Sequence, residues 1–302
     1  MSEKRIAGAL AAAVTPLRDD GRQLDEAAIE ALLELYRGGR LDGLLVLGTT
    51  GEGILLDERE RRLAAELFLA GRGPLRVIVH CGAQTTAQTT ALAAHAAEAG
   101  ADAVAVIPPP YFALGVGELT AHLAAAAAAC APLPFYAYEY ADRSGYGIPV
   151  EVIERLRERL PNLVGMKVSD APFERLAPYL ALGLDIFVGA EPLIARGLAH
   201  GAVGAVSGVA AAFPAEVASL VRDPTAANAA LVESIRATLS KHSFQAAVKA
   251  ALAARGVPIR ADVRAPLQPL SDESVATLRA DVQQLFGART PAPGVSRAFS
   301  LN

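Results

Sequence analysis

The sequence is poor in the residues that hold metal ions or cross-link chains. It contains two cysteines, five histidines and no tryptophan. Cys81 and Cys130 fall on a predicted strand and a predicted helix, without the clustered spacing of a zinc site or the cysteine density of a disulfide framework. No metal site is therefore expected, and two buried thiols are the simpler interpretation.

Runs of like charge and long apolar segments are also absent. The formal net charge is −4 and there is no basic stripe, so neither nucleic acid nor a membrane is an expected partner. The most apolar stretch, residues 123–130, is mostly alanine and shorter than the ~20 residues that cross a bilayer. The first residues, Met-Ser-Glu-Lys-Arg, are not followed by a cleavable apolar helix, which predicts a cytoplasmic protein.

Short apolar runs alternate with helical patterns along most of the chain. This alternation is typical of parallel strands joined by helices, and runs that are apolar on both faces fit strands covered on both sides. We therefore predict an α/β fold, a (β/α)8 TIM barrel. An open doubly wound sheet is the alternative, but the sequence after the second strand is not the dinucleotide fingerprint. The predicted strands lie near residues 6–14, 43–47, 76–80, 103–107, 135–138, 163–168, 186–188 and 202–206.

The chain divides into three predicted parts. Residues 1–222 form the barrel and catalytic domain, residues 223–287 a C-terminal helical extension, and residues 288–302 an irregular tail rich in Pro and Gly. Three helices are expected in the extension, at 225–240, 244–255 and 271–286. Helix start signals are also present: Asp25 and Asp57 as caps, Pro149 and Pro192 as early helical positions.

Lys167 is the first candidate for chemistry. Only four of the 28 basic residues are lysines, and this one stands inside an apolar strand. Burying an unpaired ammonium is costly, which favours the neutral amine, the nucleophile that attacks a carbonyl to form an imine. The alternative is a lysine that reaches a carboxylate at the barrel rim. Arginine would serve an ion pair equally well, so we interpret Lys167 as a nucleophile.

Two further segments lie where strands end, and the active sites of such barrels lie at that end. The turn Gly48-Thr49-Thr50 offers backbone N–H groups and two hydroxyls, a combination that suits a small carboxylate, although an ordinary glycine turn has the same composition. Strand five ends in Tyr136-Ala-Tyr138-Glu139, and alternation places both tyrosines on one face. A phenol beside an imine can relay protons, whereas a rim tyrosine can also simply fill space.

Weaker candidates surround these segments. Arg143 either binds a second carboxylate as a forked pair or is a solvated loop residue. His80 is interpreted as a hydrogen-bonded rim or core histidine rather than a ligand. Gly189 and Val206, close to the ends of strands seven and eight, are expected to line the pocket.

Four motifs in this order resemble the dihydrodipicolinate synthase and N-acetylneuraminate lyase family. They are Gly-Thr-Thr-Gly-Glu after strand two, Pro-Pro-Tyr-Phe after strand four, a tyrosine closing strand five and Gly-Met-Lys on strand six, with Thr15-Pro16 and Asp20-Gly21 near the start. The resemblance covers nearly all of the chain. It implies an imine between Lys167 and pyruvate or a related 2-oxo acid, and a carboxylate bound by Thr49 and Thr50.

The resemblance also implies that Tyr136 is the proton shuttle and that the C–C bond step is an aldol-type addition or its reversal. It implies no metal and no organic cofactor. Members of the family are commonly tetramers built from dimers, so a homo-oligomer, a tetramer or a dimer, is expected. Glu139, Tyr138, Tyr111 and Phe112 join the predicted substrate-binding residues, together with Gly48.

Three departures from the synthase pattern affect the second substrate. Phe112 stands where a second tyrosine is usual and cannot relay a proton to a neighbouring subunit. Ala137 stands where Asn is usual, and counting from Tyr136 makes the path to Arg143 longer than in the synthases. Arg143-Ser-Gly still resembles the synthase Arg-Thr-Gly, so an acidic aldehyde stays among the expected substrates.

The leading hypothesis is therefore a lysine-imine lyase or aldolase that acts on pyruvate or a related 2-oxo acid and an unassigned aldehyde. The nearest alternative is 4-hydroxy-tetrahydrodipicolinate synthase proper. Two others stay open: a 2-oxo-acid or sugar-acid dehydratase that uses the same imine, and a sensor that binds a 2-oxo acid without turnover.

Overall fold

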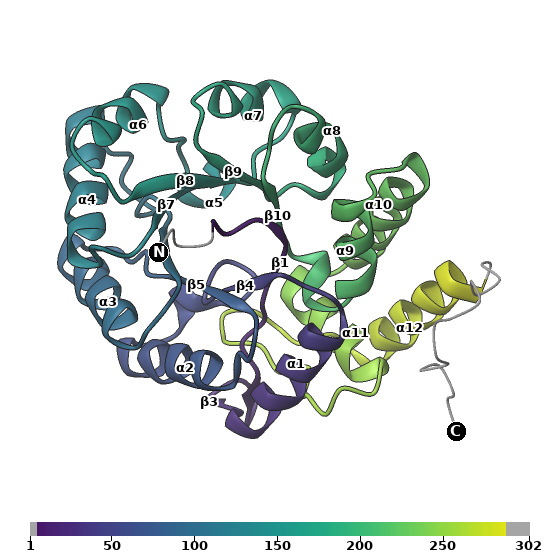
Figure 1. Cartoon of the computed structure of the whole chain (residues 1–302). Coiled ribbons are helices and arrows are strands. Elements are labelled where there is room, and N and C mark those ends of the chain that lie inside the picture. The colour runs from purple at the N-terminus through teal and green to yellow at the C-terminus, as the bar shows by residue number, and fades with distance from the viewer. Residues whose placement is uncertain (1–4, 288–302) are drawn as a thin grey trace.

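The computed structural model describes residues 5–287, so the predicted irregular tail at 288–302 lies outside the described residues. Eight parallel strands close into a barrel in the order β1-β10-β9-β8-β7-β6-β5-β4 (Figure 1), which confirms the predicted TIM barrel. Their bounds are β1 (Gly8–Ala12), β4 (Gly43–Val46), β5 (Arg76–His80), β6 (Ala103–Val106), β7 (Phe135–Glu139), β8 (Leu163–Val168), β9 (Asp185–Val188) and β10 (Gly204–Ser207).

Helices surround the barrel between successive strands (Figure 1). They are α1 (Glu26–Gly38), α2 (Glu58–Gly71), α3 (Thr86–Glu98), α4 (Val116–Ala129), α5 (Ala141–Ser144), α6 (Val150–Arg157), α7 (Phe173–Leu180), α8 (Ile194–Ala199) and α9 (Pro214–Arg222). Three short 3-10 helices follow strand ends: η1 (Gly53–Leu55), η2 (Glu191–Leu193) and η3 (Val209–Ala211). A small hairpin of β2 (Leu17–Arg18) and β3 (Gln23–Leu24) was not expected.

The strands are buried on both faces, as predicted. One set of side chains, which includes Leu10, Ile78 and Phe187, fills the barrel interior. The other set, which includes Val77 and Ile186, packs against the surrounding helices. A half-exposed sheet would alternate apolar and polar residues, so these two cores account for the continuous apolar runs.

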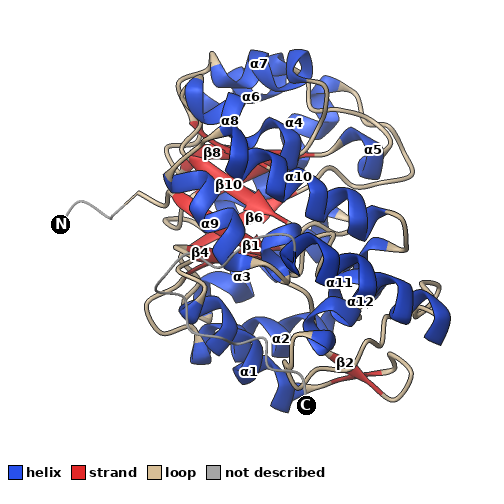
Figure 2. Ribbon diagram, turned by 90° about the vertical axis from the view of Figure 1, so that its right-hand side faces the viewer, coloured by secondary structure: helices blue, strands red, loops and turns tan. Residues whose placement is uncertain are grey.

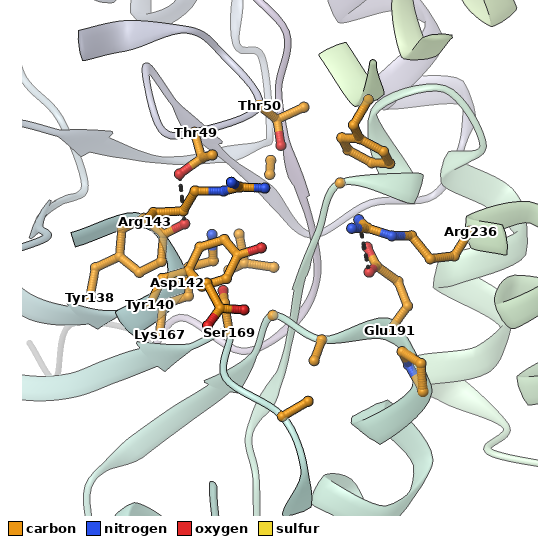
Figure 3. Close-up of a pocket in the computed structure, with 18 of the residues that line it drawn as sticks. Thr49, Thr50, Tyr138, Tyr140, Asp142, Arg143, Lys167, Ser169, Glu191 and Arg236 are labelled. Carbon is orange, nitrogen blue, oxygen red and sulfur yellow. Dashed lines mark hydrogen bonds and ion pairs between the residues drawn. The ribbon is translucent and has the colours of Figure 1, made fainter. Parts of the chain in front are cut away.

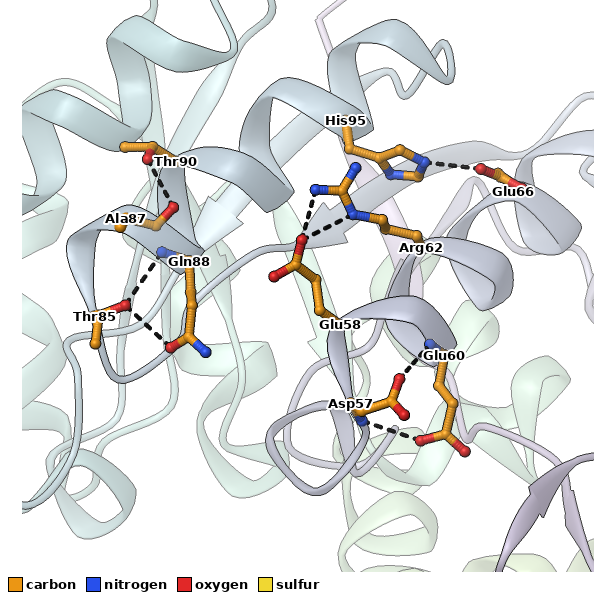
Figure 4. A network of polar contacts seen from close by, with 10 residues as sticks. All are labelled: Asp57, Glu58, Glu60, Arg62, Glu66, Thr85, Ala87, Gln88, Thr90 and His95. Carbon is orange, nitrogen blue, oxygen red and sulfur yellow. Dashed lines mark hydrogen bonds and ion pairs between the residues drawn. The ribbon is translucent and has the colours of Figure 1, made fainter.

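Local capping explains where two outer helices begin (Figure 4). Asp57 Oδ1 accepts a hydrogen bond from the Glu60 N–H at 2.8 Å, and Glu60 Oε2 accepts one from the Asp57 N–H at 3.0 Å, so Asp57 caps α2 as predicted. Thr85 Oγ1 caps α3 by accepting from the Gln88 N–H at 3.2 Å. Asp25 precedes α1, but its side chain makes no capping bond, so that prediction holds for position only.

The predicted C-terminal helices are present as α10 (Ala226–Ser240), α11 (Phe244–Ala254) and α12 (Asp272–Gly287). Helix α10 packs on α9 and η2, and α12 packs on both α10 and α11. Figure 2 places α10, α11 and α12 at the end of the barrel where α5 also lies, which is the end reached by the carboxyl termini of the strands. The division at residue 222 stays a prediction.

Cys81 and Cys130 are both free and buried, which confirms their interpretation as buried thiols. Burial raises the pKa of the Cys81 thiol to about 12 and that of Cys130 to about 11. Both thiols are therefore poor nucleophiles at neutral pH. Separately, no helix within residues 5–287 is both long and apolar enough to cross a membrane.

Candidate active site

Lys167 lies on β8, one residue before the strand ends, and its side chain lines a cavity of about 300 Å³ at the carboxyl end of the barrel. The residue is 5% exposed. Its Nζ atom lies 3.9 Å from the centroid of the Tyr138 ring. Within the described chain, no carboxylate lies at ion-pair distance from this nitrogen, in contrast to the rim ion pair considered as an alternative. The amine therefore faces a pocket rather than a partner.

Tyr138 is the tyrosine that accompanies Lys167. The two residues are register partners on the neighbouring strands β7 and β8, so both side chains project into the barrel at the same level. The Tyr138 hydroxyl lies 3.1 Å from Thr49 Oγ1 (Figure 3). One phenol thus lies between the amine and the turn that follows β4.

The resemblance implies that Tyr136 is the proton shuttle, but the structure does not bring Tyr136 beside Lys167. Alternation does send Tyr136 and Tyr138 to the same face, but Tyr136 stands two positions earlier on β7, about 6–7 Å deeper along the strand. Its ring packs on Phe187 inside the barrel, and it lines a separate cavity with Arg5 and Asp185. Burial raises its pKa to about 12. Tyr136 belongs to the amino-terminal half of the barrel interior.

This correction changes the comparison with the synthase pattern. Counted from Tyr138, the path to Arg143 is two residues shorter than from Tyr136. Glu139, not Ala137, then follows the strand-end tyrosine. The expected lengthening of this segment therefore rested on the wrong tyrosine.

The turn after β4 brings two predicted residues into the cavity. Thr49 and Thr50 both line it, and in the described structure their backbone N–H groups donate to no protein acceptor. The turn depends on left-handed backbone at Leu47, with a φ of 61°, and at Glu52, with a φ of 56°. Free N–H groups and hydroxyls at one place make a site for a small anion. Gly48 lines an adjoining cavity that shares Thr49 with the first.

His80 contacts the backbone of this turn through its ring nitrogen. Its Nδ1 lies 3.0 Å from the carbonyl oxygen of Leu47, and its Nε2 accepts a longer hydrogen bond, of 3.4 Å, from the Ile107 N–H. Burial, with Arg61 nearby, lowers the pKa of His80 to about 3, so the ring is neutral. A neutral ring with a proton on Nδ1 satisfies both contacts. The interpretation as a hydrogen-bonded core histidine is confirmed.

Glu139 does not join the cavity, contrary to the prediction that it binds substrate. As alternation requires, its side chain lies on the face opposite Tyr138, where its Oε2 accepts a hydrogen bond from the Ile148 N–H. It is 1% exposed. Burial, and secondarily the nearby Asp170 carboxylate, raises the pKa of Glu139 to about 7. The residue supports the loop behind the site.

Tyr111 and Phe112 also lie away from the cavity of their own chain. Their rings pack edge to face, with centroids 4.9 Å apart, and they are 85% and 73% exposed. Within one chain these residues therefore do not complete the site. Their participation across a subunit boundary stays a prediction.

Arg143, Gly189 and Val206 line the cavity, as predicted. Arg143 extends from the short helix α5, and its guanidinium carbon lies 5.4 Å from the centroid of the Tyr140 ring. In Figure 3 its guanidinium points across the pocket rather than into a solvated loop. This placement fits the first of its two interpretations, a group available to an acid.

The sequence reasoning missed the part of the site that comes from the C-terminal helices. Arg236 on α10 and Phe244 and Gln245 on α11 line the same cavity as Lys167. Gln245 Nε2 donates a hydrogen bond of 3.2 Å to the Thr49 carbonyl oxygen. These residues belong to no motif, and no local pattern indicated them. The extension is therefore part of the pocket wall.

Comparisons with known proteins agree on one family. A family model described as the dihydrodipicolinate synthetase family matches residues 5–285. An uncharacterised DapA-like lyase of Chloroflexus aurantiacus is 34% identical over 96% of this chain and 100% of the relative. A 4-hydroxy-tetrahydrodipicolinate synthase of Salinibacter ruber is 34% identical over 71% of this chain and 72% of its own length. The solved N-acetylneuraminate lyase of Proteus mirabilis has a TM-score of 0.87 at 29% identity, covering 94% of this chain and 99% of that structure.

Proposed function

The chain belongs to the dihydrodipicolinate synthetase family, as its motifs implied, and on this premise we propose that it is a lyase that makes or breaks C–C bonds of 2-oxo acids through an imine on Lys167. The substrate class follows from the carbonyl chemistry of an unpaired amine. Pyruvate or a related 2-oxo acid is one reactant, and an aldehyde is the other.

The single observation that carries this proposal is the position of Lys167. Its Nζ lies 3.9 Å from the Tyr138 ring, and the Tyr138 hydroxyl lies 3.1 Å from Thr49. An amine, a phenol and an anion-binding turn thus meet in one cavity. A 2-oxo acid needs these three groups side by side, because its carboxylate and its carbonyl are adjacent.

The Lys167 amine adds to the C2 carbonyl of the oxo acid and water leaves, which gives an imine. In the synthetic direction the protonated imine loses a proton from C3 to give an enamine. C3 of the enamine then bonds to the aldehyde carbon, which regenerates the protonated imine, and the aldehyde oxygen takes up a proton. Water finally hydrolyses the imine and restores the amine. Cleavage is the same sequence reversed.

Each nearby group has a role in this scheme. The N–H groups and hydroxyls of Thr49 and Thr50 bind the oxo-acid carboxylate. Tyr138 carries protons to and from the carbinol and aldehyde oxygens, and Thr49 Oγ1 orients its hydroxyl. Arg143 faces the second reactant from α5.

Borohydride reduction in the presence of pyruvate tests the proposal. We expect a reduced pyruvyl adduct on the peptide that contains Lys167, identified by mass spectrometry, and its loss in Lys167→Met. Lys241→Met is the matched control, because Lys241 pairs with Asp281 on the surface and is expected to leave the adduct intact. An adduct on another lysine, or none with any of a panel of 2-oxo acids, would contradict the proposal.

A second candidate is 4-hydroxy-tetrahydrodipicolinate synthesis itself, in which the aldehyde is acidic. The placement of Arg143 in the cavity favours it. Consumption of aspartate semialdehyde with pyruvate tests this candidate directly. With a hydroxylated 2-oxo acid as the single substrate, loss of its hydroxyl as water without C–C bond change would indicate the dehydratase. Adduct formation on Lys167 without turnover of any substrate would indicate the sensor.

A further inference from the structure

Arg236 brings a second guanidinium to the cavity from the side opposite Arg143. It comes from α10, in the C-terminal extension, and its side chain is 32% exposed. Figure 3 shows the guanidinium groups of Arg143 and Arg236 directed toward each other across the pocket, with Lys167 on the side of Arg143. The two arginines therefore face each other in the cavity that Lys167 also lines.

Arg236 is held in place by two contacts. Its Nη1 lies 3.4 Å from Glu191 Oε2, and its guanidinium carbon lies 4.1 Å from the centroid of the Phe244 ring. An ion pair on one edge and an aromatic ring against the plane restrict the side chain before any ligand binds. Pre-organisation of this kind reduces the entropy lost on binding.

The ion pair with Glu191 uses only part of the hydrogen-bonding capacity of Arg236. Glu191 is 3% exposed, and its Oε1 already accepts hydrogen bonds from the Ser207 hydroxyl at 2.8 Å and the Val209 N–H at 3.1 Å. Arg236 contributes one contact, to Oε2. A guanidinium carries five N–H donors, and within residues 5–287 no other protein acceptor contacts this one. Its remaining donors face the cavity.

Arg143 has a matching arrangement, with its guanidinium stacked near Tyr140 and no protein acceptor in the described structure. Asp142, the acidic neighbour of Arg143, also lines the cavity and lies 4.0 Å from Arg175. The guanidinium groups of Arg143 and Arg236 thus both have N–H donors directed into the same cavity. Planar guanidinium groups match carboxylate and phosphate oxygens.

We propose that Arg236 is a specificity-determining residue that binds an anionic group, a carboxylate or a phosphate, on the end of the substrate remote from the imine. The inference rests on the proposed lyase function and deepens it, because it makes the aldehyde partner acidic. The Lys167 end of the pocket selects the oxo acid, and Arg236 selects the charge of its partner.

Condensation of pyruvate with three aldehydes tests this assignment. Glyceraldehyde is neutral, glyceraldehyde 3-phosphate carries a phosphate, and succinic semialdehyde carries a carboxylate. We expect the wild type to favour at least one charged aldehyde over glyceraldehyde. Arg236→Gln should lower kcat/KM for that aldehyde by roughly 10- to 100-fold, mainly through KM, and reduce the ratio of charged to neutral turnover.

Two further variants keep the test sharp. Arg236→Lys retains a point charge without the fork, so it should retain part of the preference, more for phosphate than for carboxylate, and it carries the test if Arg236→Gln does not fold. Arg155→Gln is the matched control, because Arg155 pairs with Glu151 on the outer helix α6, and it should leave the ratio unchanged.

The outcomes separate this inference from the proposed function. No pyruvyl adduct on wild-type Lys167 after borohydride reduction would overturn the lyase proposal itself. An adduct together with no preference for either charged aldehyde, or with the same charged-to-neutral ratio in the wild type and Arg236→Gln, would overturn the role of Arg236 alone. The aldehyde whose turnover depends most on Arg236 distinguishes a phosphate from a carboxylate.

Discussion

The Nζ atom of Lys249 lies 2.6 Å from Oε1 of Glu52, and both side chains are fully buried. Glu52 belongs to the turn after β4, and Lys249 to α11. The other oxygen of Glu52, Oε2, accepts a hydrogen bond of 2.6 Å from the Arg264 N–H, and Lys249 also donates one of 2.7 Å to the Asp262 carbonyl. Within residues 5–287, two buried lysines therefore have opposite settings: Lys249 is paired and structural, while Lys167 has no ion-pair partner and faces a cavity.

Removal of Lys249 should destabilise the protein strongly. Lys249→Met leaves the Glu52 carboxylate buried without its counter-charge, which costs about 3–5 kcal/mol. We expect the urea concentration at the midpoint of unfolding to fall by the amount that corresponds to this loss of unfolding free energy. Lys241→Met, which removes a surface pair with Asp281, should change the midpoint little. Equal effects of the two substitutions would contradict the structural role of the buried pair.

Exchange of the two tyrosines of β7 should separate their roles. Tyr138→Phe removes the hydroxyl next to Thr49 and Lys167 and should lower kcat by roughly 10²- to 10⁴-fold. Tyr136→Phe removes a hydroxyl outside this cavity and should retain most of the turnover. Steady-state kinetics with pyruvate and the preferred aldehyde provide the measurement. A larger loss in Tyr136→Phe than in Tyr138→Phe would return the proton relay to Tyr136.

The turn after β4 should tolerate no side chain at Gly53. A Cβ atom there would lie 1.8 Å from the Leu47 carbonyl oxygen, which is backbone and cannot rotate away. Gly53→Ala should therefore distort the turn and raise the KM for pyruvate at least tenfold, since about 1.4 kcal/mol of lost binding suffices for that change. Gly117→Ala is the control: nothing lies within 4 Å of its added Cβ, and alanine favours the helix. An unchanged pyruvate KM in Gly53→Ala would show that the turn does not bind the carboxylate.

Glu139 should make stability depend on pH between about 5 and about 7. Its pKa is raised in the folded state to about 7, above the ordinary value of 4.5, because of burial and then Asp170. The folded state thus binds this proton more tightly than the unfolded state. The resulting stabilisation is complete at low pH and is lost as the pH rises through the folded pKa, with a slope of at most about 1.4 kcal/mol per pH unit.

Glu139→Gln, which cannot ionise, should remove this dependence. The unfolding free energy of the variant minus that of the wild type should therefore be larger at pH 8 than at pH 5. Urea titration at both pH values measures this difference. Glu151→Gln, at an exposed position on α6, serves as the control and should follow the wild type. A constant difference between wild type and Glu139→Gln across this range would show that Glu139 does not titrate there.

The barrel and the buried position of Lys167 could be predicted because their signals are local. Strand β8 was predicted with its observed bounds, and Lys167 is conspicuous as a cation inside an apolar run. The choice between Tyr136 and Tyr138 failed because it depends on how far β7 extends and on its register with β8. In the structure Tyr138 and Lys167 each stand one residue before the end of their strands, whereas the strand predicted from the sequence ended at residue 138.

Other parts of the site could not be derived from the sequence. Arg236 and Phe244 lie on amphipathic helices whose pattern resembles that of any packed helix, and only tertiary packing turns them toward the cavity. The hairpin of β2 and β3 was missed because strands of two residues show no periodicity. Glu139 followed the rule of alternation, which places it behind the strand rather than in the pocket.

The hydrogen bond from Gln245 to Thr49 joins residues that are 196 positions apart. During translation the turn after β4 therefore leaves the ribosome long before the helix that contacts it. A nascent chain that has completed all eight strands still lacks Arg236 and Phe244, which line the cavity, and Lys249, which pairs with Glu52. Growing polypeptides should accordingly be inert toward cellular metabolites, and enzymatic competence should arise only in the last stage of synthesis.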